Sequence, residues 1–186
     1  VNKKKLNDLH KLLHIQKNEL VIATMGRLIK QKGIIEFYHA AKFLKKQKQN
    51  LRFIIIGLDD DQNPSKISDD VLNEIENIGI KILKNRNDIR EILSLVDIFV
   101  LASYREGLPQ SIIEAQAMGV PVVTTDVAGC HERVRNNYNG YLVRKKDPRS
   151  LSLAISKLIE NPNKRRVFSE RGLRIINEAM DQRIII

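Results

Sequence analysis

Short, wholly apolar runs alternate along this chain with longer segments in which apolar residues recur every three or four positions. The runs predict strands that are buried on both faces of a sheet, and the spaced pattern predicts amphipathic helices. The expected strands are 20–25, 51–56, 80–83, 97–102, 120–125 and 141–143. The expected helices are 33–47, 68–77 with Ser68 as its cap, 88–96, 109–118, 150–160 and 163–179.

Strands and helices alternate almost without exception in this pattern, which predicts an α/β domain with a doubly wound, Rossmann-like parallel sheet. Ligands of such sheets bind beyond the carboxyl ends of the strands. Functional side chains are therefore expected in the loops that follow the strands. The segment 1–19 precedes the first strand and is expected to be a linker with a short amphipathic helix, whose apolar residues are Leu6, Leu9, Leu12 and Leu13.

The composition of the chain limits the classes of protein to which it can belong. The chain has 186 residues, of which 42% are hydrophobic and 29% charged, values typical of one globular domain. Its apolar runs are far shorter than the roughly 20 residues that a membrane-spanning helix needs. The first residues show no secretory signal pattern. The single cysteine, Cys130, excludes an internal disulfide framework and fits a reducing, cytoplasmic compartment.

The formal net charge of +10 suggests an anionic partner. Nucleic acid, an anionic membrane surface and a phosphorylated ligand are the candidates. The basic residues are scattered over many segments, and neither a zinc-binding spacing nor an aromatic RNA-stacking signature is present. A nucleic-acid partner is therefore not expected. An ordinary solvated surface explains any single basic cluster equally well.

The loop after the first predicted strand combines glycines with basic residues. Gly26 permits a tight turn as the chain leaves the strand, and Gly33 begins the next helix. Arg27 and Lys32 come between them. A guanidinium can hold a diphosphate through two hydrogen bonds, and an ammonium adds a compact charge. The two residues could thus neutralise a leaving diphosphate without a metal, or they could simply be exposed beside a helix start.

The segment 103–129 carries the second set of candidate residues. Its turn at 107–109 begins a helix, where backbone N–H groups favour an anion. Glu106 and Glu114 flank that turn, and their carboxylates could bind sugar and ribose hydroxyls. An acid–base pair of the kind that glycoside hydrolases use is the alternative. The basic residues expected at the same edge of the sheet favour the binding roles.

Taken in order, these segments resemble the motifs of a large family of retaining glycosyltransferases, the family numbered four, also called glycosyl transferases group 1. Residues 26–33 read GRLIKQKG, residues 106–109 read EGLP and residues 114–123 read EAQAMGVPVV. Later elements are GCHE at 129–132 and NGYLV at 139–143. The resemblance covers roughly residues 15 to 180. It implies the C-terminal, donor-binding half of a GT-B fold.

The resemblance also implies a role for each matching position. Arg27 and Lys32 would bind the donor diphosphate and stabilise the charge that develops on it. Glu114 would accept hydrogen bonds from the ribose, and Glu106 would face the transferred sugar. Glu106, Arg27 and Lys32 are the expected catalytic residues. The expected donor-binding residues are Gly26, Arg27, Lys32, Arg86, Glu106, Gly107, Leu108, Pro109, Gln110, Ser111 and Glu114.

Further groups are expected around the same donor. The backbone amides of Leu108, Gln110 and Ser111 could reach sugar or phosphate oxygens. Arg86 and Asp88 would lie near the nucleobase. Neither a metal nor a cofactor is expected, because the nucleotide sugar is itself the substrate.

The resemblance implies that half of the active site is missing from this chain. In the family the N-terminal half supplies the acceptor site, so an acceptor sugar or lipid-linked sugar would be bound there. We expect 1–19 to be a linker from that half, 20–180 the donor-binding domain, and 181–186 the truncated start of a segment that crosses back. The isolated chain is expected to bind donor and to transfer little or no sugar.

The sequence thus predicts the donor-binding domain of a transferase that uses a UDP- or GDP-sugar in bacterial surface polysaccharide or glycolipid synthesis. Peripheral contact with the inner face of the cell membrane is a further expectation. The alternatives are a sugar-nucleotide epimerase on the same architecture and a non-catalytic module that binds an anionic membrane or nucleic acid. The binding module would leave Glu106 and Glu114 without a role.

Overall fold

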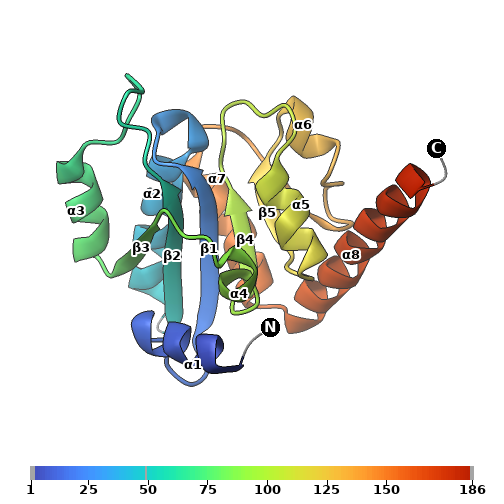
Figure 1. The fold of residues 1–186 in the computed structure, drawn as a ribbon, viewed down its shortest axis with the longest axis horizontal. Coiled ribbons are helices and arrows are strands. Elements are labelled where there is room, and N and C mark those ends of the chain that lie inside the picture. Colours follow the sequence, from blue (N-terminus) through green and yellow to red (C-terminus); the bar gives the residue numbers. More distant parts are fainter. Residues whose placement is uncertain (1–2, 49, 185–186) are drawn as a thin grey trace.

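A computed structural model describes residues 3–48 and 50–184 (Figure 1). Six parallel strands form one sheet in the order β3-β2-β1-β4-β5-β6. The strands are β1 (Leu20–Arg27), β2 (Leu51–Leu58), β3 (Ile80–Lys84), β4 (Ile98–Leu101), β5 (Val122–Thr125) and β6 (Gly140–Val143). The strand order reverses direction between β1 and β4, which is the arrangement of a doubly wound α/β fold. The predicted fold class is therefore confirmed.

Helices cover both faces of the sheet (Figure 1). They are α1 (Lys3–Leu12), the short 3-10 helix η1 (Lys30–Lys32), α2 (Ile34–Gln47), α3 (Asp69–Asn77), α4 (Ile89–Leu93), α5 (Gln110–Ala117), α6 (Ala128–His131), α7 (Pro148–Ile159) and α8 (Pro162–Ile184). One apolar core joins the sheet to α2, α3 and α7, and the other joins it to α1, α4 and α5. Burial on both faces explains why the strand sequences are apolar throughout.

The central strands determine where a ligand can bind. β1 pairs with β2 from Leu20–Leu51 to Arg27–Leu58, and with β4 on its other side. The change of direction thus lies between β1 and β4. The loop after β1 contains η1, and the loop after β4 contains Glu106. Both predicted site segments therefore come from the two strands that flank this point, where doubly wound sheets bind their ligands.

Several element boundaries differ from the prediction. The helix expected at 88–96 is only Ile89–Leu93, and the last helix continues to Ile184 beyond its expected end at 179. Neither α6 nor η1 was expected, because three or four residues are too few to show a helical period. Of the expected crossover start at 181–186, residues 185–186 lie outside the described part of the chain, as do residues 1–2.

The helix ends also differ from the prediction. Ser68 occupies the N-cap position of α3, but its side chain makes no capping hydrogen bond. A side-chain cap is found instead at α7, where the Asp147 carboxylate accepts a hydrogen bond from the Ser150 N–H at 2.9 Å. In α1 the predicted apolar residue Leu12 is 43% exposed. Leu9 is buried against the core, because its position faces the sheet.

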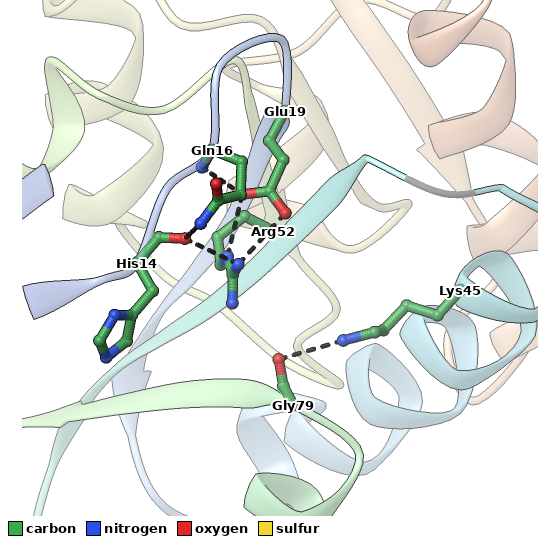
Figure 2. A network of polar contacts seen from close by, with 6 residues as sticks. All are labelled: His14, Gln16, Glu19, Lys45, Arg52 and Gly79. Carbon is green, nitrogen blue, oxygen red and sulfur yellow. Dashed lines mark hydrogen bonds and ion pairs between the residues drawn. The ribbon is translucent and has the colours of Figure 1, made fainter. Parts of the chain in front are cut away.

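A polar network at the amino ends of the strands ties the segment between α1 and β1 to β2 (Figure 2). The Arg52 guanidinium donates to the His14 carbonyl at 2.8 Å and to both carboxylate oxygens of Glu19 at 3.1 and 3.2 Å. Nearby, the Lys45 ammonium donates to the Gly79 carbonyl at 3.1 Å. These two cations bind protein acceptors, so part of the positive charge of the chain has a structural role.

Candidate functional site

A pocket of about 490 Å³ opens at the carboxyl edge of the sheet. It lies between the loop after β1 and the start of α5, and apolar residues such as Met25, Ile56 and Leu58 contribute to its lining. All of the predicted donor-binding residues except Gly107 line this pocket: Gly26, Arg27, Lys32, Arg86, Glu106, Leu108, Pro109, Gln110, Ser111 and Glu114. Residues that are far apart in the sequence thus line one pocket. The order of the motifs along the chain could not show this by itself.

Lys32 and Glu106 form an ion pair across the pocket. The Lys32 Nζ lies 2.6 Å from Glu106 Oε1, with side-chain exposures of 23% and 8%. A pair that is shielded from water to this degree interacts more strongly than an exposed pair. The carboxylate of one predicted catalytic residue therefore compensates the charge of another. The sequence predicted that both residues belong to the site, but it did not predict this contact.

Arg27 is engaged by a carboxylate that was not predicted. Its Nη1 lies 2.8 Å from Asp60 Oδ2, and the Arg27 side chain is 52% exposed. Asp60 also accepts a hydrogen bond from the Asn63 side-chain amide at 3.0 Å. The guanidinium thus lies over the loop after β2. Asp60 sits in a polar loop without a motif, so no sequence signal marked it.

The loop that carries Glu106 is fastened to the strand and helix that follow α5. The Gly129 N–H donates to the Glu106 carbonyl at 3.1 Å, and the Thr125 hydroxyl donates to the Ser103 carbonyl at 2.5 Å. A Cβ at Gly129 would lie 2.2 Å from the Gly107 carbonyl oxygen. Any larger residue at position 129 would therefore displace the loop. The first residue of the GCHE segment at 129–132 thus allows the Glu106 loop to pack closely against α6.

The turn before α5 differs in one respect from the expectation. The Gln110 N–H donates to the Leu108 carbonyl at 2.9 Å, so this amide is engaged within the turn. Pro109 occupies the N-cap position, and its carbonyl accepts from the Ile112 N–H at 3.0 Å. Ser111 lies in the first turn of α5, where N–H groups lack intrahelical carbonyl partners. The positive end of α5 thus faces the pocket that Ser111 lines.

Glu114 lines the same pocket, and burial raises the pKa of its carboxyl above the ordinary value. Arg86 binds Asp88 through two hydrogen bonds, of 2.7 and 2.5 Å. The Arg86 guanidinium lowers the pKa of Asp88 through these bonds. Arg86 lines the pocket, while Asp88 serves as its partner.

Cys130 and His131 lie close to the site without adding chemistry to it. Burial raises the pKa of the Cys130 thiol to about 11. The thiol is therefore protonated at neutral pH, whereas a nucleophilic cysteine needs its thiolate. His131 Nδ1 lies 3.0 Å from Asp126 Oδ1 at the surface. Neither observation gives the two residues a chemical role in the pocket.

Among residues 3–48 and 50–184, no group of three or more His, Cys, Asp or Glu side chains is arranged so that it could hold a metal ion. The pocket itself is lined by three cations, Arg27, Lys32 and Arg86, by the carboxylates of Glu106 and Glu114, and by the first residues of α5.

Comparison with known proteins identifies the family of this chain. The model of a family described as glycosyl transferases group 1 matches residues 7–174. The chain belongs to the glycosyl transferases group 1 family. The resemblance drawn from the sequence motifs is thereby confirmed.

Two known relatives align with most of this chain. The N,N'-diacetylbacillosaminyl-diphospho-undecaprenol alpha-1,3-N-acetylgalactosaminyltransferase of Campylobacter jejuni is 40% identical over 151 residues, which cover 81% of this chain and 38% of that protein. The capsular polysaccharide biosynthesis glycosyltransferase CapM of Staphylococcus aureus is 31% identical over 176 residues, 95% of this chain and 45% of CapM. The chain thus spans less than half the length of these relatives.

Solved structures confirm the fold of this glycosyl transferases group 1 domain. HepE of Anabaena, solved in complex with UDP-glucose, superposes with a TM-score of 0.83 at 22% identity, covering 96% of this chain and 49% of HepE. The C-terminal domain of the group 1 protein LpcC from Francisella tularensis superposes with a TM-score of 0.78 at 23% identity, covering 95% and 92%. The fold is therefore that of a C-terminal GT-B domain.

Proposed function

We propose that this chain is the nucleotide-sugar donor-binding domain of a retaining glycosyltransferase, and that the sugar comes from a UDP- or GDP-sugar. The observation that carries the proposal is the convergence of Arg27, Lys32, Glu106 and Glu114 on one pocket at the topological switch point. The names of the relatives support the reaction class, since they are transferases of capsular polysaccharide and of diphospho-undecaprenol-linked sugars. We place the chain in the same kind of pathway, bacterial surface polysaccharide or glycolipid synthesis.

In this proposal the donor spans the pocket from the Glu114 end to the Glu106 end. The ribose hydroxyls donate to Glu114, the base lies toward Arg86, and the sugar hydroxyls donate to Glu106. Arg27 and Lys32 hold the diphosphate between them. Because both cations already contact carboxylates, the phosphate oxygens join or replace those contacts on binding.

The chemical role of the cations follows from the charge that the reaction creates. As the glycosidic bond breaks, negative charge grows on the departing diphosphate. Positive groups held in place beforehand stabilise that charge without first having to reorganise. We propose that Arg27 and Lys32 supply this stabilisation and that neither a metal nor a cofactor takes part. The acceptor would bind to the half of the enzyme that lies outside this chain.

Calorimetry tests the donor site. UDP or GDP should bind the wild-type chain, and the double substitution Arg27→Ala with Lys32→Ala should abolish binding, because no cation would face the diphosphate. Lys30→Ala is the matched control, since Lys30 is an exposed cation of the same segment that does not line the pocket. Unchanged affinity in the double variant would refute the site assignment.

A second variant separates the two ends of the donor. Glu114→Gln should weaken binding of the nucleoside diphosphate, because the ribose loses a charged acceptor. The same variant should bind free diphosphate as wild type does. Equal losses for both ligands would show that Glu114 acts on the fold of the pocket and not on the ribose.

We also propose peripheral contact with an anionic membrane, on the cytoplasmic side. Two relatives are named for acceptors carried on diphospho-undecaprenol, a lipid. Among the described residues no helix has the length and apolar character of a membrane span. The net charge of +10 would draw the chain to a negative lipid surface.

A further inference from the structure

Tyr104 connects the two loops that form the candidate site. It precedes Glu106 by two residues, and its N–H donates to the carbonyl of Gln31, the residue before Lys32, at 2.9 Å. Its hydroxyl donates to Glu36 Oε1 in α2 at 2.7 Å. One residue of the β4–α5 loop is therefore bonded at two points to the η1–α2 segment. These bonds run beside the Lys32–Glu106 ion pair.

Glu36, the acceptor of the tyrosine hydroxyl, is a buried carboxylate. Glu36 is only 9% exposed, and its second oxygen, Oε2, is buried and has no hydrogen-bond partner among the described residues. Burial and the bond to Glu36 both raise the pKa of Tyr104, so its hydroxyl keeps its proton to donate. Lys146 Nζ lies over the tyrosine ring, 4.9 Å from its centroid. The ring and the hydroxyl are thus both held in place.

The other attachments of the Glu106 loop face the opposite direction. Gly129 and Thr125 bind the loop toward β5 and α6. They would keep the loop folded if the tyrosine hydroxyl were lost, but they cannot set its distance from η1. The bonds that Tyr104 makes to the η1–α2 segment therefore help to set the position of Lys32 relative to Glu106.

We propose that Tyr104, with Glu36 as its acceptor, is a positioning residue that sets the geometry of Lys32 and Glu106 at the diphosphate–sugar end of the donor site. Tyr104 touches neither donor nor reacting atoms in this assignment. Its effect on ligands rests on the proposed function, whereas its effect on the ion pair does not.

Binding measurements with Tyr104→Phe test the effect on ligands. The variant keeps the ring and loses the hydroxyl, so affinity for UDP-glucose or GDP-mannose, whichever binds wild type, should fall about tenfold, as expected for a hydrogen bond to a charged group. Affinity for the matching nucleoside monophosphate should not change, because its ribose lies at the Glu114 end. Equal losses for both ligands, or no loss for either, would overturn the inference.

The chain offers a matched control. Tyr38 also donates its hydroxyl to a carboxylate, that of Glu74, and Tyr38 does not line the pocket. Tyr38→Phe should therefore leave both affinities at the wild-type level. Glu36→Gln should retain tight binding because its amide oxygen still accepts from Tyr104, and Glu36→Leu should behave as Tyr104→Phe does. Wild-type affinity in Glu36→Leu would contradict the assignment of Glu36 as the acceptor.

A double-mutant cycle on the free chain tests the geometry without any ligand. The unfolding equilibrium constants of Tyr104→Phe, Glu106→Gln and the double variant should show a coupling of about threefold or more. The cycle of Tyr38→Phe with Glu106→Gln should be additive. Additive effects in the Tyr104 cycle would overturn the inference. Failure of wild type to bind any nucleotide would instead refute the proposed function, so the two can be told apart.

Discussion

At the scale of single residues, the site depends on one glycine that no other residue can replace. Gly33 lies between Lys32 and α2 in the left-handed conformation, with φ of 69°. A Cβ at this position would lie 2.0 Å from the Ala102 carbonyl oxygen, at the end of β4. The absence of a side chain thus lets the loop after β1 approach the loop after β4, and with them Lys32 and Glu106.

Gly33→Ala should consequently destabilise the fold strongly. The substitution would both strain the backbone and displace one loop. Because the free-energy costs of these two effects add, we expect a loss of about 3 kcal/mol or more in the free energy of unfolding. Gly107→Ala is the control, because a Cβ there meets nothing within 4 Å, and it should cost less than about 1 kcal/mol. Chemical denaturation of both variants measures the difference. Similar losses would show that the close approach of the loops is not needed.

The residues that line the candidate pocket could be predicted to a large extent, but their contacts could not. The motifs named Lys32 and Glu106 correctly as neighbours of one pocket. Their ion pair, and that of Arg27 with Asp60, depend on side-chain directions that sequence spacing does not specify. The contact of Tyr104 could not be predicted either, because the acceptor of its hydroxyl, Glu36, is far away in the sequence.

At the scale of elements, the buried strands were the easiest to predict, because apolar runs indicate strands covered on both faces. Short helices such as α6 escaped prediction, although α6 brings Gly129 against the Glu106 loop. A second feature that pattern alone did not indicate is the start of β4. There Asp97 exchanges two hydrogen bonds with Val21 of β1, both of 2.8 Å. This contact joins the two strands that flank the site.

The Asp97 contact predicts a specific pH dependence. Burial raises the pKa of Asp97 above the ordinary value of 3.8, so the folded state binds the proton more tightly than the unfolded state does. The stability that this proton contributes is complete below pH 3.8 and is lost as the pH rises through the raised pKa. Asp97→Asn removes this titration and keeps an acceptor for Val21. Its unfolding free energy at neutral pH should therefore equal or exceed that of wild type.

Urea denaturation of wild type, Asp97→Asn and Asp97→Ala between pH 3 and pH 8 tests this pH dependence. Asp97→Ala has no acceptor for the Val21 N–H and should lose about 1–2 kcal/mol throughout the range. The difference between Asp97→Asn and wild type should change only near the raised pKa. A constant difference, or a lower stability of Asp97→Asn at neutral pH, would contradict the account of a carboxylate destabilised by burial.

At the scale of the whole molecule, the chain corresponds to less than half the length of the relatives that it matches. Its sheet, both apolar cores and the candidate pocket lie within the described residues, so the alternation of strands and helices along this chain was enough to predict the fold. The relatives are more than twice as long, with 38% and 45% of their lengths covered. The chain therefore offers a test of what one domain does by itself.

The charge of that domain leads to a prediction about membranes. With a net charge of +10, the chain should sediment with vesicles that contain anionic lipid at low salt and should not sediment with neutral vesicles. Binding should fall steeply as salt rises, because the screening length shortens from about 10 Å at 0.1 M to about 3 Å at 1 M. Glu106→Gln and Glu114→Gln, which alter the donor pocket, should bind vesicles at least as well as wild type. Binding that persists at 1 M salt would instead point to an apolar insertion, and equal binding to neutral vesicles would remove charge as the cause.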